Sequence, residues 1–341
     1  MKAAGLFKIG DIRVVETEKP SIGPGEILMK VEAATTCGSD LKMFLREYPG
    51  LRLPLIPWGH ESAGIVEEVG EGVNSFEVGD RITSHNTAPC GYCFYCKKEL
   101  YELCENLTQR WGAYAEYARI PGRIVKMATF EIPDHMTYAE ASLIEPFACT
   151  VHGAEEANIQ LGDKITIIGC GFQGLSFIQL ARLYGASTII AVDLDDYRLG
   201  LAKKLGADII SNPSRENVEG IVNKVTSGRK CDVVIEAAGM PETWEQAIDL
   251  VRKGGTVIEY GGCKPGTHIT VDTRRLHYDA LAIKGVFHTN PKHVQLAWDL
   301  MVNRKIDLSL MITKEMKLGN ICQAYEELKS NRRNIKIAII P

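Results

Sequence analysis

The stretch KITIIGCGFQG, residues 164–174, decides the fold of the central part of the chain. Residues 164–169 are typical of a buried strand, and Gly169, Gly171 and Gly174 complete the spacing G-x-G-x-x-G. The residues that follow have the pattern of a helix. A glycine triplet alone is weak evidence, but a triplet between a buried strand and a helix lets a pyrophosphate approach the helix N-terminus. The stretch therefore predicts a dinucleotide-binding α/β unit.

The acidic residue expected in such a unit is Asp193, at the end of a second apolar segment, STIIAVD (187–193). Its carboxylate is placed to accept hydrogen bonds from the adenosine ribose hydroxyls and to repel a 2′-phosphate. The sequence therefore predicts NAD(H) as the cofactor, in preference to NADP. We also assign Phe172, Gln173 and Arg198 to the cofactor site. The alternative is a glycine turn beside an unrelated surface aspartate.

Strands and helices alternate along the rest of this region, which predicts βαβ units and a parallel sheet. The further strands expected here are CDVVIEAAG (231–239), GGTVIEYGG (254–262) and LAIKGVF (281–287).

The first 150 residues or so have a different sequence pattern, in which short apolar runs alternate with turn signals. This pattern favours a barrel-like β domain. The tail holds a helix and a last apolar strand, and we expect it to return to this first domain. The strands expected first are GEILMKVEAA (25–34), AGIVEEVG (63–70) and GDRITSHN (79–86), and the tail elements are HVQLAWDLMVN (293–303) and IKIAII (335–340).

Composition narrows the class of protein. A chain of 341 residues is long enough for two domains. The net charge of −4 argues against a general binder of nucleic acid or of acidic membranes. The first twenty residues lack the apolar core of a signal peptide, and no run of eighteen apolar residues occurs, so we expect a cytoplasmic protein that makes no membrane contact.

Four cysteines lie within CGYCFYCKKELYELC, residues 90–104. A disulfide framework is disfavoured because the spacing is too tight for two unstrained bridges and the compartment is reducing. A ferredoxin-type cluster needs a shorter last gap followed by proline. Four thiolates with no open position suit a structural Zn²⁺. The predicted ligands are Cys90, Cys93, Cys96 and Cys104.

A second, scattered set of ligand-type residues has the mixture usual for a catalytic zinc, a thiolate, an imidazole and carboxylates. Each member also has a simpler interpretation, as core filler, as a loop histidine or as an acidic residue at a helix start. Spacing alone leaves both interpretations open. The set is Cys37 in TTCGSD, His60 and Glu61 in WGHESAG, and Glu145 in LIEPFACTVHG.

These motifs, in this order, resemble the zinc-dependent medium-chain dehydrogenase/reductase family, in the branch of the sorbitol, galactitol-phosphate and threonine 3-dehydrogenases. The resemblance extends along essentially the whole chain and is specific for the family but weakly specific for substrate. It implies a GroES-like, β-rich catalytic domain at 1–152 and 293–341 and a Rossmann domain at 153–292. The matching motifs are CGSD (37–40), GHE (59–61), the four-cysteine segment, IEP (144–146), GCGFQG (169–174) and IKGVF (283–287).

The resemblance also implies roles for single residues. Cys37, His60 and Glu61 would hold the catalytic zinc, Glu61 directly or through water, and Glu145 would be a direct or exchanging fourth ligand. Asp40 would orient the zinc-binding histidine. Ser39 would receive the proton of the alcohol. With the structural site, this makes two Zn²⁺ per chain.

Three departures from the family pattern concern the substrate. Lys42 stands where the family has a histidine that relays the proton. The relay then falls to Lys42, if its pKa is depressed, or to water. Alternatively, Lys42 attracts an anionic substrate together with Arg46, or it is simply a solvated side chain. His288 stands where sorbitol dehydrogenases have Arg-Tyr. The segment before residue 112 is shorter than usual, and its Trp111 is a candidate substrate contact.

The sequence thus predicts an NAD- and zinc-dependent dehydrogenase of a secondary alcohol, namely a polyol, a sugar or a sugar acid. The alternatives are an enzyme like threonine 3-dehydrogenase and a non-catalytic scaffold that binds NADH. The family resemblance implies a homotetramer or a homodimer.

Overall fold

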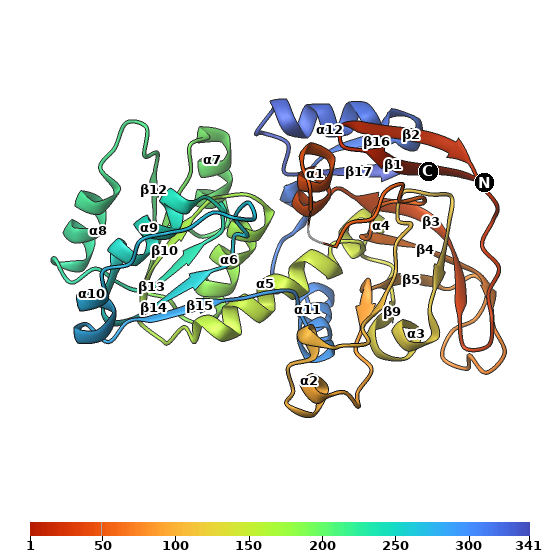
Figure 1. Ribbon diagram of the computed structural model, residues 1–341, viewed down its shortest axis with the longest axis horizontal. Helices are drawn as coiled ribbons and strands as arrows, with labels where there is room; N and C mark the ends of the chain where they lie inside the picture. The colour runs from red at the N-terminus through yellow and green to blue at the C-terminus, as the bar shows by residue number, and fades with distance from the viewer. Residues whose placement is uncertain (49) are drawn as a thin grey trace. The chain divides into compact units, whose positions relative to one another are not determined.

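The computed structural model describes residues 1–48 and 50–341, which form two compact units (Figure 1). Unit 1 consists of Met1–Ala148 and Thr289–Pro341, and unit 2 of Cys149–His288. The sequence placed these boundaries after residues 152 and 292. Helix α5 (Ile144–Ala157) continues across the first boundary.

Unit 2 is built on a six-stranded sheet in the order β12-β11-β10-β13-β14-β15, with every pair parallel. The central strands are almost continuous runs of Val and Ile that are buried on both faces, as helices flanking the sheet require (Figure 1). The strands are β10 (Lys164–Ile168), β11 (Thr188–Val192), β12 (Ile209–Ser211), β13 (Cys231–Glu236), β14 (Val251–Glu259) and β15 (Ala282–Gly285). The helices are α6 (Phe172–Leu183), α7 (Asp196–Lys204), α8 (Val218–Thr226), α9 (Pro241–Leu250) and α10 (Thr273–Tyr278).

The strand order reverses between β10 and β13. Following the chain, β11 and β12 are added on one side of β10, and β13, β14 and β15 are then added on its other side. Such a doubly wound sheet binds its ligand outside the carboxyl ends of the strands, at the point of reversal. The glycine loop Gly169–Gly174 lies at that point, between β10 and α6.

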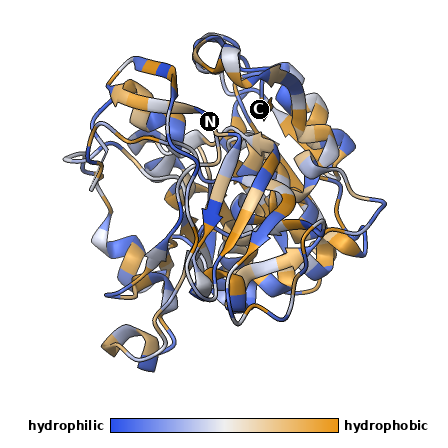
Figure 2. Ribbon diagram, turned by 90° about the vertical axis from the view of Figure 1, so that its right-hand side faces the viewer, coloured by the Kyte–Doolittle hydropathy of each residue, from blue (hydrophilic) through white to orange (hydrophobic). Residues whose placement is uncertain are grey.

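Unit 1 contains a mainly antiparallel sheet in the order β16-β17-β3-β4-β5-β9, with β8 also paired to β3. The strands that face the viewer in Figure 2 carry hydrophobic and hydrophilic residues along the same strand, as expected for a sheet with one covered face. Strand β17, from the tail, pairs with β3, where Ala338 is opposite Thr35. The tail is therefore part of the sheet that carries the N-terminal motifs.

Unit 1 also contains two short two-stranded sheets, β1-β2 and β6-β7, and several helices. The strands are β1 (Lys2–Lys8), β2 (Asp11–Glu16), β3 (Ile27–Thr35), β4 (Ser62–Val69), β5 (Arg81–Ser84), β6 (Thr87–Ala88), β7 (Thr108–Gln109), β8 (Tyr117–Ile120), β9 (Thr129–Glu131), β16 (Ile312–Lys317) and β17 (Lys336–Ile340). The helices are α1 (Gly38–Leu45), α2 (Phe94–Lys97), α3 (Gly122–Ala128), α4 (Tyr138–Ala141), α11 (Pro291–Val302) and α12 (Ile321–Ser330), with short 3-10 helices η1 (Tyr101–Leu103), η2 (Ser309–Met311) and η3 (Leu318–Asn320). Across residues 1–48 and 50–341, no helix combines the length and the apolar character needed to cross a membrane.

Candidate zinc centres and cofactor site

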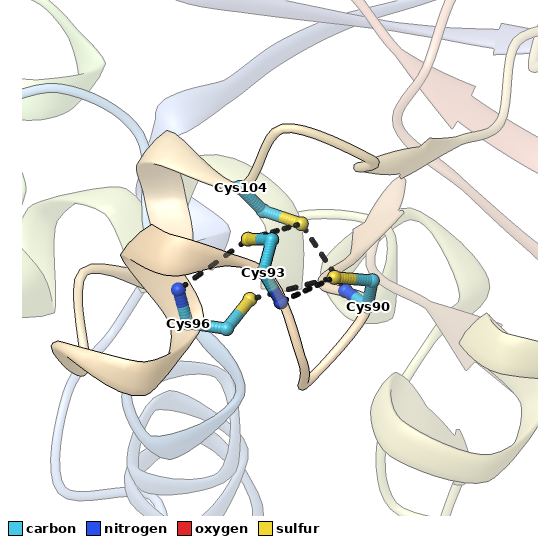
Figure 3. Close-up of side chains that lie close together, drawn as sticks. All are labelled: Cys90, Cys93, Cys96 and Cys104. Atoms are coloured by element: carbon cyan, nitrogen blue, oxygen red, sulfur yellow. Dashed lines mark hydrogen bonds between the residues drawn. The ribbon is translucent and has the colours of Figure 1, made fainter.

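The four clustered cysteines point toward one another in the lobe formed around α2 and η1 (Figure 3). The Sγ atoms of Cys90 and Cys96 are 3.9 Å apart, and those of Cys93 and Cys104 are also 3.9 Å apart. A tetrahedron of sulfurs at about 2.3 Å from Zn²⁺ has edges of roughly 3.8 Å, whereas a disulfide needs about 2 Å. All four residues are free cysteines. The geometry fits zinc and does not fit disulfides.

Backbone amides of the lobe donate to three of these sulfurs, whereas burial raises the pKa of the fourth thiol, that of Cys96, to about 12. The amide of Cys93 donates to the sulfur of Cys90 at 3.3 Å, and the amide of Cys90 donates to the sulfur of Cys104 at 3.2 Å. The amide of Cys96 donates to the sulfur of Cys93, and this contact lowers the pKa of the Cys93 thiol to about 6. Since zinc binds the thiolate, these amides favour the form that a metal needs.

The scattered ligand-type residues also come together, from three separate segments of unit 1. Cys37 is the N-cap of α1, His60 precedes β4, and Glu145 lies in the first turn of α5. The ligand atoms of Cys37, His60 and Glu61 lie within 4.8 Å of one another. Glu145 Oε2 is 3.8 Å from His60 Nε2, and two ligands of one tetrahedral zinc would be about 3.4 Å apart. Burial raises the pKa of Glu145 to about 7, so this carboxylate lacks a full set of compensating contacts in the protein alone.

Glu61 is already engaged by the protein. Both of its carboxylate oxygens accept hydrogen bonds from Lys336 Nζ, at 2.5 and 2.6 Å, and Thr35 Oγ1 donates to one of them. Glu61 is fully buried and Lys336 is 2% exposed, so this is an ion pair in the interior. Lys336 belongs to β17, which places it beside Glu61 although the two residues are 275 positions apart. Any direct bond from Glu61 to zinc therefore competes with this pair.

His60 is oriented by a buried carboxylate. Asp40 Oδ1 lies 3.1 Å from His60 Nδ1, which leaves Nε2 directed toward Glu145 and the metal position. Asp40 Oδ2 in turn accepts hydrogen bonds from the hydroxyls of Tyr114, at 2.9 Å, and Tyr325, at 3.3 Å. Burial lowers the pKa of His60, but Asp40 and Cys37 outweigh it, so the pKa lies well above its usual value. Zinc must therefore displace a proton from this imidazole.

The two tyrosines that hold Asp40 are themselves locked in place. Their hydroxyl oxygens are 2.7 Å apart, and both rings pack against Trp58. Gly59 makes room for Tyr114, because a Cβ at residue 59 would lie 2.5 Å from that ring. Tyr325 comes from α12, in the tail. These side chains fix the carboxylate that orients His60, a candidate zinc ligand.

Replacing Asp40 by asparagine is expected to weaken zinc binding at the catalytic centre about 10- to 100-fold, the range typical for residues that orient metal ligands. The amide has almost the same shape, but it cannot supply the negative charge that strengthens His60 as a donor. Competition with a chromogenic chelator measures the affinity. Tyr325→Phe removes the longer of the two hydroxyl contacts to Asp40 and should have a smaller effect in the same assay; equal affinities in the Asp40→Asn variant and the native protein would contradict the role.

The charges of this centre are matched to a divalent cation. The Arg110 guanidinium is buried, donates to Ser62 Oγ at 2.9 Å, and keeps a pKa of about 10, lowered by burial. With His60 neutral and with Cys37 and Glu145 ionised, as zinc binding requires, the centre would contain four anionic and two cationic groups, a net charge of −2 that Zn²⁺ would neutralise. The anions are Cys37, Asp40, Glu61 and Glu145, and the cations are Arg110 and Lys336.

Residues with proposed roles in proton transfer and substrate binding lie around this centre. Ser39 Oγ donates to Cys37 Sγ at 3.1 Å. Lys42 follows Ser39 at the i+3 position, so the two lie along one face of α1, and Arg46 is the C-cap of this helix, with an extended backbone. The Trp111 ring packs edge-on against the His60 ring, with 5.7 Å between the centroids.

Several residues of the centre have no local sequence signal. His85, which follows β5, is buried, and its Nε2 is 3.9 Å from Glu145 Oε1. Tyr114 and Tyr325 belong to segments without a motif. Lys336 did carry a signal, because a lysine within the apolar strand IKIAII must find a buried partner or leave the core.

The glycine loop of unit 2 has the geometry that a pyrophosphate requires. A Cβ at Gly174 would lie 1.8 Å from the carbonyl oxygen of Gly169, so the helix can approach the strand only without a side chain there. Gly169 has a φ of +93°, in the region that favours glycine. A Cβ at Gly171 would meet only the Arg198 guanidinium, at 3.9 Å, so this position is open to a ligand.

The other residues assigned to the cofactor lie around this loop. Asp193 accepts hydrogen bonds from the amides of Cys170, at 2.7 Å, and Asp195, at 2.8 Å, so its carboxylate is fixed beside the loop. Phe172 and Gln173 form the first turn of α6, and the Gln173 side chain accepts a hydrogen bond from Thr150. His288 has a left-handed backbone, with a φ of +57°, and its carbonyl contacts His152 Nδ1 at 2.8 Å.

Comparison with known proteins agrees with this geometry. The family model described as Alcohol dehydrogenase GroES-like domain matches residues 23–133, and the one described as Zinc-binding dehydrogenase matches residues 174–303. The first contains the cysteine lobe, Cys37 and His60. The second begins at the last glycine of the phosphate loop.

Whole-chain relatives extend the likeness. A D-arabitol-phosphate dehydrogenase of Enterococcus avium is 33% identical over 95% of this chain and 92% of its own. A sorbitol dehydrogenase of Bacillus subtilis (strain 168) is 32% identical over 100% of this chain and 97% of its own. A solved structure from Sinorhizobium meliloti 1021, bound to NADP, is 33% identical, with a TM-score of 0.91 over 100% of this chain and 99% of that one.

The two family models match parts of both units. The range 23–133 contains Cys37, His60, Glu61 and the four-cysteine lobe, and the range 174–303 begins at Gly174. The chain therefore belongs to the zinc-dependent medium-chain dehydrogenase/reductase family, in the branch of the polyol and threonine dehydrogenases.

Proposed function

We propose that the protein oxidises a secondary alcohol of a polyol, a sugar or a sugar acid and transfers the hydride to NAD⁺, reversibly giving the ketone. The observation that carries this proposal is the cluster of Cys37, His60 and Glu61, whose ligand atoms lie within 4.8 Å of one another. Glu145 Oε2 is 3.8 Å from His60 Nε2, and the Ser39 hydroxyl is 3.1 Å from the Cys37 sulfur. Three donors of different chemistry are the usual set for a zinc that keeps a position for substrate.

Each residue of this centre has a separate role in the proposed reaction. Asp40 holds His60 with Nε2 toward the metal position, and Cys37 and Glu145 supply the negative charge there. Bound zinc would act as a Lewis acid that lowers the pKa of the substrate hydroxyl. Ser39 relays the hydroxyl proton, accepting it while passing its own hydroxyl proton to water or to Lys42, and the hydride transfer itself is the chemistry of the nicotinamide. For zinc we propose two ions per chain, the second in the lobe of Cys90, Cys93, Cys96 and Cys104.

The substrate proposed is polar and, among the candidates, preferably anionic. Lys42 shares one face of α1 with Ser39, and Arg46 follows as the C-cap of the same helix. Two cationic side chains beside the proton acceptor would attract a carboxylate or a phosphate group of the substrate. The names of the relatives include a phosphorylated polyol, which agrees with this preference. Homo-oligomerisation as a tetramer or a dimer is part of the same proposal.

The decisive experiment is a substrate panel on purified protein, with NADH absorbance as the readout and the zinc content measured in parallel. The panel contains sugar alcohols, sugar acids, phosphorylated polyols, L-threonine and simple secondary alcohols. Activity on a polyol, a sugar or a sugar acid supports the proposal. Activity on L-threonine alone would replace it with the amino-alcohol reaction, and inactivity together with loss of the zinc at Cys37 and His60 would favour a non-catalytic role.

Replacing Asp193 by alanine is expected to weaken NAD⁺ binding about 10- to 100-fold, because hydrogen bonds to a charged group contribute about 1.5–3 kcal/mol. The variant should also lose discrimination against NADP⁺, because the charge that repels a 2′-phosphate is gone. Dissociation constants for both cofactors, measured by the quenching of protein fluorescence, check this. Glu242→Ala, which removes an exposed carboxylate of α9 in the same unit, is the matched control. An unchanged ratio of NAD⁺ to NADP⁺ affinity in Asp193→Ala would show that another residue sets the preference.

A further inference from the structure

Two carboxylates lie side by side in the interior of unit 2. Glu236 is the last residue of β13 and Glu259 the last residue of β14, and they are direct partners in the register of these parallel strands. Side chains of paired residues project to the same face of a sheet. Glu236 is fully buried and Glu259 is 4% exposed. Neither takes part in the zinc chemistry or in the phosphate loop.

The two carboxylates receive very different support. Oε1 of Glu236 accepts hydrogen bonds from the amides of Ala238 and Gly239, both at 2.8 Å, and from Thr243 Oγ1 at 2.7 Å. In the part of the chain that the structure describes, Glu236 Oε2 and both oxygens of Glu259 have no hydrogen-bond partner. A negative charge is therefore better stabilised on Glu236, and Glu259 is the member that keeps a proton.

The surroundings of Glu259 contain little to stabilise a second charge. On the other side of β14, strand β15 places Gly285 opposite Glu259. Lys284 extends away to the carbonyl oxygen of Glu156, at 3.0 Å. Tyr260 packs its ring against Phe177. Burial, and then the charge of Glu236, raise the pKa of Glu259 to about 8, so most molecules carry the proton at neutral pH.

The place of this pair in the sheet connects it with the dinucleotide. Along the carboxyl edge of the sheet, Asp193 follows β11, the glycine loop follows β10, and the two glutamates end β13 and β14. Asp193 marks the adenosine side of the point of reversal. A dinucleotide that crosses the reversal at the loop therefore extends its nicotinamide half over the ends of β13 and β14. The backbone supports this arrangement, because Gly169 packs against Ala237 and Ala238, directly after Glu236.

We propose that Glu259 distinguishes the oxidised from the reduced cofactor, by releasing its proton to solvent when the cationic nicotinamide of NAD⁺ binds and retaining it when the neutral dihydronicotinamide of NADH binds. This rests on the proposed function, in so far as unit 2 must bind a nicotinamide dinucleotide. The O–H bond of Glu259 breaks and its proton passes to a buffer base. No covalent bond of the cofactor changes. A carboxylate stabilises a neighbouring cation and a carboxylic acid does not, so the ionisation of Glu259 follows the charge of the ring.

The test is calorimetric titration of the zinc-loaded protein with NAD⁺ and with NADH at pH 7, in two buffers of different ionisation enthalpy. The expected result is release of about one proton with NAD⁺ and none with NADH. Below pH 8, the dissociation constant of NAD⁺ should rise about tenfold for each unit of acidification, while that of NADH stays constant. Equal proton release with both cofactors would overturn the proposal.

Glu259→Gln replaces the protonated carboxyl with a neutral group of the same shape. The variant should fold, release no proton with NAD⁺, and bind it with a pH-independent affinity. Glu236→Gln keeps an acceptor for the amides of Ala238 and Gly239 but removes the neighbouring charge, so the pH dependence should move to lower pH. Glu242→Gln, an exposed residue of α9, is the matched control and should behave like the native protein.

These experiments distinguish a failure of the Glu259 proposal from a failure of the proposed dehydrogenase function. Proton release that persists in Glu259→Gln would assign it to another group and overturn this inference, although NAD⁺ binding and turnover would be intact. Failure of the native protein to bind either cofactor would overturn the proposed function and the inference together. The readout is binding, so it does not depend on knowing the alcohol substrate.

Discussion

Replacing His60 by alanine is expected to lower kcat/KM by about a thousandfold or more, with the fold and NAD⁺ affinity unchanged. His60 is a proposed zinc ligand whose two ring nitrogens face two carboxylates, Nδ1 at 3.1 Å from Asp40 and Nε2 at 3.8 Å from Glu145. Without it, zinc loses a donor, and the remaining set of Cys37 and the carboxylates leaves the metal weakly held. A Lewis acid supplies several kcal/mol of stabilisation to developing charge, and each 1.36 kcal/mol corresponds to a factor of ten.

The measurement is steady-state turnover with zinc content determined on the same sample. His135→Ala is the matched control, because His135 belongs to unit 1 and is exposed. NAD⁺ binding, which depends on unit 2, should be the same in both variants. A His60→Ala protein that retained more than about a tenth of the native kcat/KM would contradict the assignment of the catalytic centre.

Replacing Cys96 by serine is expected to remove one zinc per chain and to lower the melting temperature of unit 1 by about 10 °C or more. Cys96 is the buried member of its lobe, and its loss leaves three thiolates around the metal position. Structural zinc contributes about 10–16 kcal/mol of binding free energy in zinc-finger peptides, and 1 kcal/mol corresponds to about 2–4 °C in a domain of this size. Residues 90–104 should also become sensitive to proteases.

The lobe and the catalytic centre use separate ligands, so turnover per remaining zinc should change less than about threefold. Cys322→Ser provides the control, because Cys322 is an exposed cysteine of α12. Zinc content, thermal unfolding and limited proteolysis report on different parts of the prediction. An unchanged zinc content in Cys96→Ser would mean that the four sulfurs do not form a metal site.

The features that the sequence predicted are those with short-range spacing. Four cysteines within fifteen residues are close enough along the chain for their sulfurs to meet, and Gly174 is required by its close approach to Gly169 within the same loop. Cys37, His60 and Glu145 are far apart in the chain, and they were identified through resemblance to a family rather than through spacing.

The supporting residues could not be predicted in the same way. Tyr325 contacts Asp40 across 285 positions, and Lys336 contacts Glu61 across 275, and such contacts are fixed by strand register and helix packing rather than by local pattern. Glu259 ends a strand that reads as apolar, and nothing in GGTVIEYGG shows that its partner in register is another glutamate. The unequal hydrogen bonding of the two exists only in the folded sheet.

The return of the tail to the first sheet has a consequence for biosynthesis. Unit 2 is continuous in sequence and is translated before Tyr325 and Lys336 emerge. A ribosome adds about 5–20 residues per second. Unit 2 therefore has several seconds in which to fold before β17 is synthesised and can pair with β3. During that interval Glu61 has no lysine partner and β3 exposes an unpaired edge. The nascent chain is therefore most vulnerable to misfolding late in translation, and early release would leave a folded nucleotide-binding unit joined to an incomplete enzyme.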